Sequence, residues 1–142
     1  MWLGRRDDIS VITTVVLPRG NGVIGAPYQW QVAPEVMGVI TQWARPQALV
    51  MLGLFHIHVG CSVAMSWSDR NRVVQVPGML SVIAGEKGRE ADLDRWGWYL
   101  YEGAEYRGLT PTERQLRIRI DDSSPCPVWA ASTDGIREVV DR

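Results

Sequence analysis

The only two histidines of the 142-residue sequence, His56 and His58, are separated by a single residue. They follow an apolar run at 48–55, whose length and branched and aromatic side chains predict a buried β-strand. Residues i and i+2 of a strand point to the same face, so both imidazoles would project together from the end of this strand. Two convergent imidazoles are a typical beginning of a zinc site.

A catalytic zinc site also needs a third protein ligand and a position that is open to water. Asp69 is the candidate for this ligand, because Ser66-Trp-Ser-Asp69 is typical of the opening of a short helix. Positions i and i+3 share a helix face, so Ser66 and Asp69 would point in the same direction. Two histidines and one carboxylate, with water in the fourth position, predict a hydrolytic site.

Each half of this pattern also has a simpler interpretation. A His-x-His pair occurs in amidohydrolases and PHP-type phosphoesterases, and a strand can carry such a pair by chance. Ser-x-x-Asp is a common capping box, in which Ser66 and Asp69 would only satisfy backbone donors. The two halves together, after an apolar strand, favour the metal site, and capping by Asp69 is compatible with metal binding.

The complete pattern, His-x-His-x7-Ser-x-x-Asp, resembles the signature of the JAMM (MPN-plus, JAB-domain) metalloproteases, which release ubiquitin-like proteins from their conjugates. All four spaced positions match. The resemblance implies that His56, His58 and Asp69 bind Zn²⁺. It also implies that Ser66 stabilises the tetrahedral intermediate or helps to hold the site together.

Two positions depart from the family pattern. The family usually has Ser or Thr between the histidines and Pro after them, where this chain has Ile57 and Val59. These positions shape the loop and are not metal ligands. The family also has a helix and a catalytic glutamate upstream of the glycine that matches Gly4, and this places the expected glutamate before Met1.

Three explanations of the missing glutamate remain open. The chain could have a different start or be a trimmed fragment, or the protein could be a binding-only relative of the family. Alternatively, another carboxylate could replace the glutamate, with Glu35, Asp7 and Asp8 as candidates. Nothing in the positions of these three residues distinguishes them from ordinary solvated surface charges.

The predicted fold is α/β, a single MPN-like domain over residues 1–120 with a central mixed β-sheet flanked by helices and without the first helix of the family. Residues 121–142 are predicted to form a C-terminal tail that either docks on the domain or stays mobile. A helix is predicted over 34–44, with Trp43 on its packed face. The other expected segments are a glycine-rich loop at 19–27, strands at 9–17, 79–84 and 96–101, a polar loop at 85–94, and an edge strand at 117–120.

Composition narrows the classes of function. A net charge of −1 and a pI near 6.1 give no reason to expect nucleic-acid binding. No apolar run is long enough to span a bilayer, and the first residues do not form a secretion signal, so a cytoplasmic protein is expected. Two cysteines, Cys61 and Cys126, are too few for a disulfide framework. Cys61 is interpreted as structural or redox-modulating in preference to a fourth zinc ligand.

The leading hypothesis is therefore zinc-dependent hydrolysis of an isopeptide or peptide bond at the C-terminus of a ubiquitin-like protein. Such a protein or its conjugates would be the partner, with conjugation-machinery proteins as further candidates. The alternative is a non-catalytic MPN-like binding or scaffold module. A phosphoesterase is the weaker third hypothesis, because such enzymes usually need more histidines and this chain has no third one.

Overall fold

The computed structural model describes residues 1–6, 10–26, 29–71, 74–89, 92–118 and 126–139. The chain divides into two compact units, one of residues 1–52 and 124–142 and the other of residues 53–123. Both are mixed α/β units, since each combines helices with parallel and antiparallel strand pairs. No helix in these described ranges is long and apolar enough to cross a membrane.

The sheet of the first unit has the strand order β10-β9-β2-β1. The β-branched strand β2 (Ser10–Pro18) pairs antiparallel with β1 (Trp2–Arg6) and parallel with β9 (Val128–Ser132). β10 (Gly135–Glu138) is antiparallel to β9. The tail predicted either to dock or to stay mobile thus contributes β9 and β10 to this sheet.

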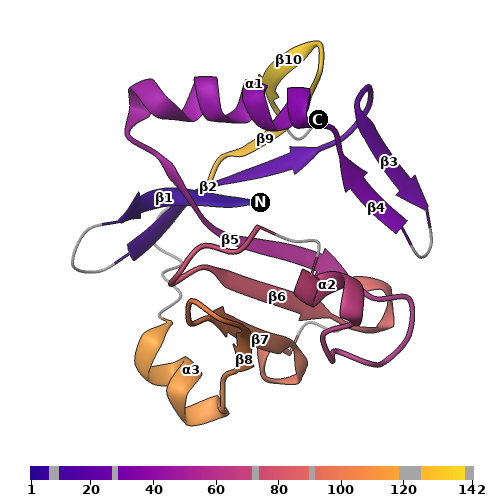
Figure 1. The fold of residues 1–142 in the computed structure, drawn as a ribbon, viewed down its shortest axis with the longest axis vertical. Helices are drawn as coiled ribbons and strands as arrows, with labels where there is room; N and C mark the ends of the chain where they lie inside the picture. The colour runs from indigo at the N-terminus through magenta and orange to yellow at the C-terminus, as the bar shows by residue number, and fades with distance from the viewer. Residues whose placement is uncertain (7–9, 27–28, 72–73, 90–91, 119–125, 140–142) are drawn as a thin grey trace. The chain divides into compact units, whose positions relative to one another are not determined.

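The helix of the first unit, α1 (Pro34–Ala44), has the predicted bounds and is followed by the 3-10 helix η1 (Arg45–Gln47). Proline fits the first turn of a helix, where its missing N–H would have no intrahelical partner. α1 packs against β9 and β10 (Figure 1) and buries Val36, Ile40 and Ala44. The ring centroids of Trp43 and Trp129 are 4.8 Å apart, which confirms a packing role for Trp43.

The glycine-rich segment at 19–27 differs from the prediction of a loop. Its residues Val23–Ala26 form β3, which pairs antiparallel with β4 (Gln29–Val32) in a separate two-stranded sheet. The loop prediction is wrong here, because a four-residue strand that contains a glycine is too short to show a clear alternation of apolar and polar residues.

The sheet of the second unit has the order β5-β6-β7-β8. The predicted apolar strand is β5 (Val50–Ile57), whose last five residues belong to this unit. It is parallel to β6 (Leu80–Ala84), which is antiparallel to β7 (Gly97–Tyr101), and β8 (Tyr106–Gly108) pairs with β7. Val82, Ile83 and Ala84 of β6 are fully buried and form the centre of this sheet.

Short helices connect these strands. α2 (Trp67–Asn71) lies beside the ends of β5 and β6 (Figure 1), and the polar segment at 85–94 contains the 3-10 helices η2 (Glu86–Gly88) and η3 (Leu93–Arg95). α3 (Pro111–Arg117) follows β8.

The edge strand predicted at 117–120 is not present in its described part. Arg117 is the last residue of α3, and residues 119–120 lie outside the described residues. A reciprocal capping box explains why this segment is helical: the side chain of Thr110 accepts a hydrogen bond from the backbone N–H of Glu113, and the Glu113 carboxylate accepts one from the backbone N–H of Thr110.

The close approach of β1 and β2 gives a prediction about stability. Gly4 lies at an irregularity of their register, where an added Cβ would be 1.8 Å from the carbonyl oxygen of Val11. This backbone atom cannot move away by a change of rotamer. Gly4→Ala should therefore lower the free energy of unfolding by about 1–3 kcal/mol, as overpacking does.

Urea denaturation measures this difference. Gly25→Ala is the matched control, because a Cβ on Gly25 has no atom within 4 Å. We expect it to stay within about 0.5 kcal/mol of the wild type. Equal stability of the Gly4→Ala variant and the control would contradict the close approach at Gly4.

Candidate metal centre

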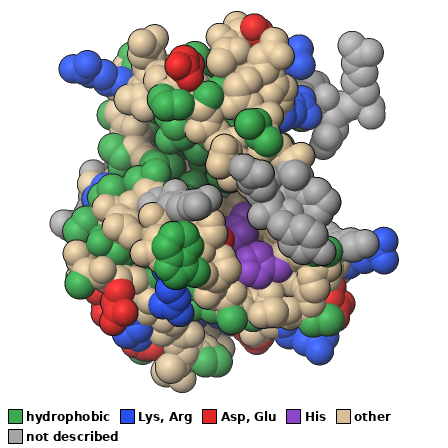
Figure 2. Space-filling model, turned by 45° about the vertical axis from the view of Figure 1, so that its right-hand side comes forward, with side chains coloured by type: hydrophobic (Ala, Val, Ile, Leu, Met, Phe, Trp, Pro, Cys, Tyr) green, Lys and Arg blue, Asp and Glu red, His purple; other side chains and the backbone are tan. Residues whose placement is uncertain are grey.

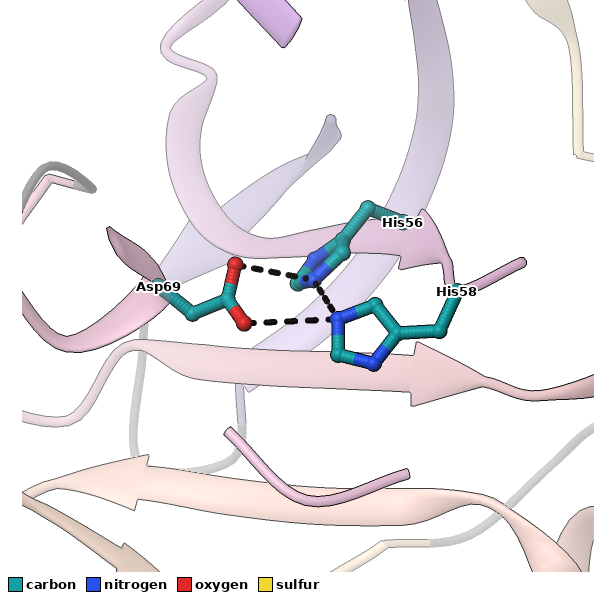
Figure 3. Close-up of side chains that lie close together, drawn as sticks. All are labelled: His56, His58 and Asp69. Carbon is teal, nitrogen blue, oxygen red and sulfur yellow. Dashed lines mark hydrogen bonds and ion pairs between the residues drawn. The ribbon is translucent and has the colours of Figure 1, made fainter. Parts of the chain in front are cut away.

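The residues predicted to form the site all lie in the second unit, at the end of β5 and the beginning of α2. His56 is on β5, and His58 follows the strand directly. The backbone N–H of His58 donates to the carbonyl oxygen of Ala84 at 2.8 Å, so the pairing with β6 continues past Ile57. The alternation of the extended chain therefore places both imidazoles on one side (Figure 3).

The three predicted metal ligands converge on one point. The Nε2 atoms of His56 and His58 are 3.2 Å apart. Asp69 Oδ1 is 3.2 Å from His56 Nε2, and Asp69 Oδ2 is 3.3 Å from His58 Nε2 (Figure 3). A tetrahedral ion with ligand bonds of about 2.0–2.1 Å keeps its ligand atoms about 3.3 Å apart. The cluster could therefore bind a metal ion.

The cluster is partly buried but remains accessible. The exposed fractions of the side chains are 25% for His56, 23% for His58 and 16% for Asp69. Figure 2 shows the two histidine side chains adjacent to each other at the surface. Partial burial strengthens the electrostatic interactions of the cluster, and the exposed part leaves room for a further ligand or a substrate.

The tautomer of His58 is determined by its second ring nitrogen. His58 Nδ1 lies 3.0 Å from the carbonyl oxygen of Ser62. A carbonyl oxygen only accepts hydrogen bonds, so Nδ1 carries the hydrogen and donates it. In the neutral ring, the lone pair of Nε2 is then directed at the cluster, and the hydrogen bond of Nδ1 fixes the ring orientation, as is usual for histidines that bind metals.

Asp69 is both part of the cluster and part of a helix cap. Its Oδ2 accepts a hydrogen bond from the backbone N–H of Ser66 at 2.8 Å, and its own N–H donates to Ser66 Oγ at 3.2 Å. Burial raises the pKa of the Asp69 carboxyl, but hydrogen bonds from His56 and Ser66 outweigh it and hold the pKa well below its usual value. The carboxylate is thus charged and available to a cation.

Two other candidate residues, Cys61 and Glu35, are not part of the cluster. The Sγ of Cys61 contacts the carboxylate of Glu86 at 3.5 Å and is not among the clustered ligand atoms. Glu35 is on α1 of the first unit, whereas Asp7 and Asp8 lie outside the described residues. In the described ranges, no further histidine, cysteine or carboxylate joins the three ligands.

One residue that supports the site, Tyr99, was not identified from the sequence. Tyr99 on β7 contacts the backbone of the segment between His58 and Ser66, through hydrogen bonds to Val63 and Met65. The aromatic strand was predicted, but no local pattern shows which backbone groups a tyrosine hydroxyl reaches more than 30 residues away along the chain.

Comparison with known proteins gives no further information about the site. No protein-family model matches the sequence, and a search of curated proteins finds no significant match. The interpretation of the site therefore depends on its own geometry and on the spacing of its four residues.

The reciprocal cap gives a prediction about α2. Ser66→Ala removes the acceptor of the Asp69 N–H, and loss of such a cap costs about 1 kcal/mol. We expect this loss in the free energy of unfolding of the metal-free chain, measured by chemical denaturation. Ser68→Ala is the control, because Ser68 is exposed on the same turn. If Ser66→Ala cost no more than Ser68→Ala, the capping role would be refuted.

Proposed function

We propose that this protein is a zinc-dependent hydrolase that cleaves isopeptide or peptide bonds at the C-terminus of ubiquitin-like proteins. The observation that carries the proposal is the convergence of His56, His58 and Asp69, at the spacing of the JAMM motif, on one partly exposed point. Polar backbone contacts support it, because the Ser62 carbonyl orients His58 and the Ser66 N–H orients Asp69 in the absence of an ion.

The ligand set favours zinc over other common cations. Two imidazole nitrogens and one carboxylate oxygen suit Zn²⁺, whereas Mg²⁺ and Ca²⁺ prefer oxygen ligands alone. Three protein ligands are typical of catalytic zinc sites, which keep a position open. A zinc ion there would supply Lewis-acid chemistry, polarising a carbonyl and lowering the pKa of water toward neutrality.

The Ser66 side chain interacts with Asp69 both as an acceptor from its backbone N–H and as a partner of its carboxylate. Its Oγ accepts from the Asp69 N–H, so its own O–H remains a donor. The resemblance implies that Ser66 supports the oxyanion of a tetrahedral intermediate, and its side chain, which is hydrogen-bonded to the Asp69 carboxylate, lies beside the metal ligands as that role requires. Ser66 would thus have two functions, since it also positions Asp69.

Exposed apolar side chains adjoin the ligands in the sequence. Ile57 lies between the histidines, Val59 follows them, and Trp67 precedes Asp69 by two residues. Their exposed fractions are 48%, 43% and 68%. Ile57 points to the face of β5 opposite to the two imidazoles, so Val59 and the strongly exposed Trp67 are the apolar side chains that we propose to contact an extended segment of a polypeptide substrate.

A metal-binding module without hydrolytic activity is the second candidate. In the described part of the chain, no additional carboxylate joins the cluster to act as a general base. General acid–base groups contribute about 10²–10⁴ to the rate, so a chain without one would cleave slowly or not at all. This candidate shares the metal site with the first and differs from it only in turnover.

Zinc content tests the shared part of both candidates. We expect about one zinc per purified chain, because the three ligands meet the requirements of one tetrahedral ion. Asp69→Ala should lower the zinc affinity at least about tenfold, since it removes the only charged ligand. Glu105→Ala, which removes an exposed carboxylate of the same unit, should retain the metal. A folded wild-type chain that takes up no zinc would rule out both candidates.

Cleavage distinguishes the two candidates. The zinc-loaded chain is incubated with a ubiquitin-like protein that carries a C-terminal peptide extension, and the released fragment is measured by mass spectrometry. Hydrolysis that a chelator abolishes and added zinc restores is the expected result, because the reaction needs the ion. A zinc-loaded chain that cleaves neither peptide nor isopeptide linkages would favour the non-catalytic module.

A further inference from the structure

One side of the sheet in the second unit supports the loop that joins two of the site residues. His56 pairs with Ile83 of β6, and Ile83 pairs with Gly97 of β7. Laterally paired residues point to the same side of a sheet, so Gly97 lies on the face from which His56 projects. Residues 58–66, here called the 58–66 loop, cross this face. A Cβ on Gly97 would lie only 2.3 Å from the carbonyl oxygen of Val63.

Tyr99 lies on the same face, two residues after Gly97, and binds this loop through a single hydroxyl. The hydroxyl donates to the carbonyl oxygen of Val63 at 2.9 Å and accepts from the backbone N–H of Met65 at 3.2 Å. Met65 is buried, with 7% of its surface exposed. The loop is therefore fixed to the sheet directly before Ser66.

The first half of the loop has its own contacts. The backbone N–H of Glu86 donates to the carbonyl oxygen of Gly60 at 2.8 Å, and His58 Nδ1 donates to the carbonyl oxygen of Ser62. The hydrogen bonds of Tyr99 hold the second half of the loop, at Val63 and Met65. Hydrogen bonds thus hold both halves of the connection from His58 to Ser66 in place.

Asp69 needs this support because its helix is short. α2 has five residues, and a helix of this length is not stable by itself. The position of Asp69 therefore depends on the residues that place the beginning of α2. Ser66 binds Asp69 through the cap, and Met65, which precedes Ser66, binds Tyr99.

We propose that Tyr99 is a positioning residue of the metal centre. Its hydroxyl holds the 58–66 loop on the sheet. This places Ser66 and Asp69 so that the Asp69 carboxylate lies at ligand distance from the Nε2 atoms of the two histidines. Tyr99 does not contact the ion. The proposal rests on the metal site of the proposed function, and it extends that site to a strand that contributes no ligand.

Tyr99→Phe tests the proposal, since it keeps the ring and removes only the hydroxyl. Tyr101→Phe is the matched control, because it also removes one hydroxyl from β7. The Tyr101 hydroxyl donates to the carbonyl oxygen of Gly103 at 3.2 Å. Each variant loses the hydrogen bonding of one hydroxyl on the same strand, and it is the Tyr99 hydroxyl that is bonded to the 58–66 loop. Far-UV circular dichroism of the metal-free chains verifies that both variants are folded.

Two measurements are made on each variant. Amide hydrogen exchange of the metal-free chain reports whether the loop is held, and competition with a chromophoric chelator reports the dissociation constant for Zn²⁺. For Tyr99→Phe we expect exchange at Met65 to accelerate on the order of tenfold, as loss of a hydrogen bond allows. We expect its zinc affinity to fall about 10–100-fold, as for other residues that orient ligands. Tyr101→Phe should change both values by no more than about twofold.

Each contrary result is decisive. Unchanged exchange at Met65 in Tyr99→Phe would show that the hydroxyl does not hold the loop, and unchanged zinc affinity would show that the loop does not position the ligands. An equal loss of affinity in Tyr101→Phe would indicate general destabilisation and overturn the proposal. Failure of the wild type to bind zinc would instead refute the proposed function, while exchange at Met65 would still decide whether Tyr99 holds the loop.

Discussion

The carboxylate of Asp69 lies against two imidazoles whose Nε2 atoms are 3.2 Å apart, and the local structure of the second unit serves to keep these three groups together. Nitrogen and oxygen atoms at this separation need a cation or shared hydrogens between them, because their lone pairs otherwise repel each other. The groups are also partly buried, so each needs a polar partner. The convergence of these three side chains is therefore the constraint that the surrounding hydrogen bonds satisfy.

Different elements determine the positions of these groups. The register of β5 with β6 places the histidines, and the Ser62 carbonyl orients one of them. The beginning of α2 places Asp69 through reciprocal bonds with Ser66. All of these residues belong to one compact unit, so the site is formed entirely within residues 53–123. An enzyme and a non-catalytic metal-binding module would share this arrangement.

The sequence predicts those parts of the fold in which residue types recur at the spacing of a strand or a helix. The alternation of an extended chain and the i, i+3 spacing of a helix led to His56, His58 and Asp69, and Pro34 with its apolar face indicated α1. α3 had a recognisable signal in Thr110 and Glu113, which the alternating charges near 117–120 obscured.

Other features could not be predicted because they depend on contacts that are distant in the sequence. The strand β3 is only four residues long and acquires its conformation by pairing with β4. The hydroxyl of Tyr99 reaches backbone groups 34 and 36 residues away, and only the register of β6 and β7 brings them together. A sequence pattern can indicate candidate metal ligands, but contacts between segments that are distant in the sequence become visible only when the strands are paired.

X-ray absorption at the zinc edge of the zinc-loaded chain tests the central claim most directly. The structure predicts a first shell of nitrogen and oxygen at about 2.0–2.1 Å, with the multiple scattering of two imidazoles and no sulfur. A sulfur atom at about 2.3 Å would show that a cysteine binds the metal. A first shell with fewer than two imidazoles would show that His56 and His58 do not both bind it. Either result would contradict a site formed by His56, His58 and Asp69.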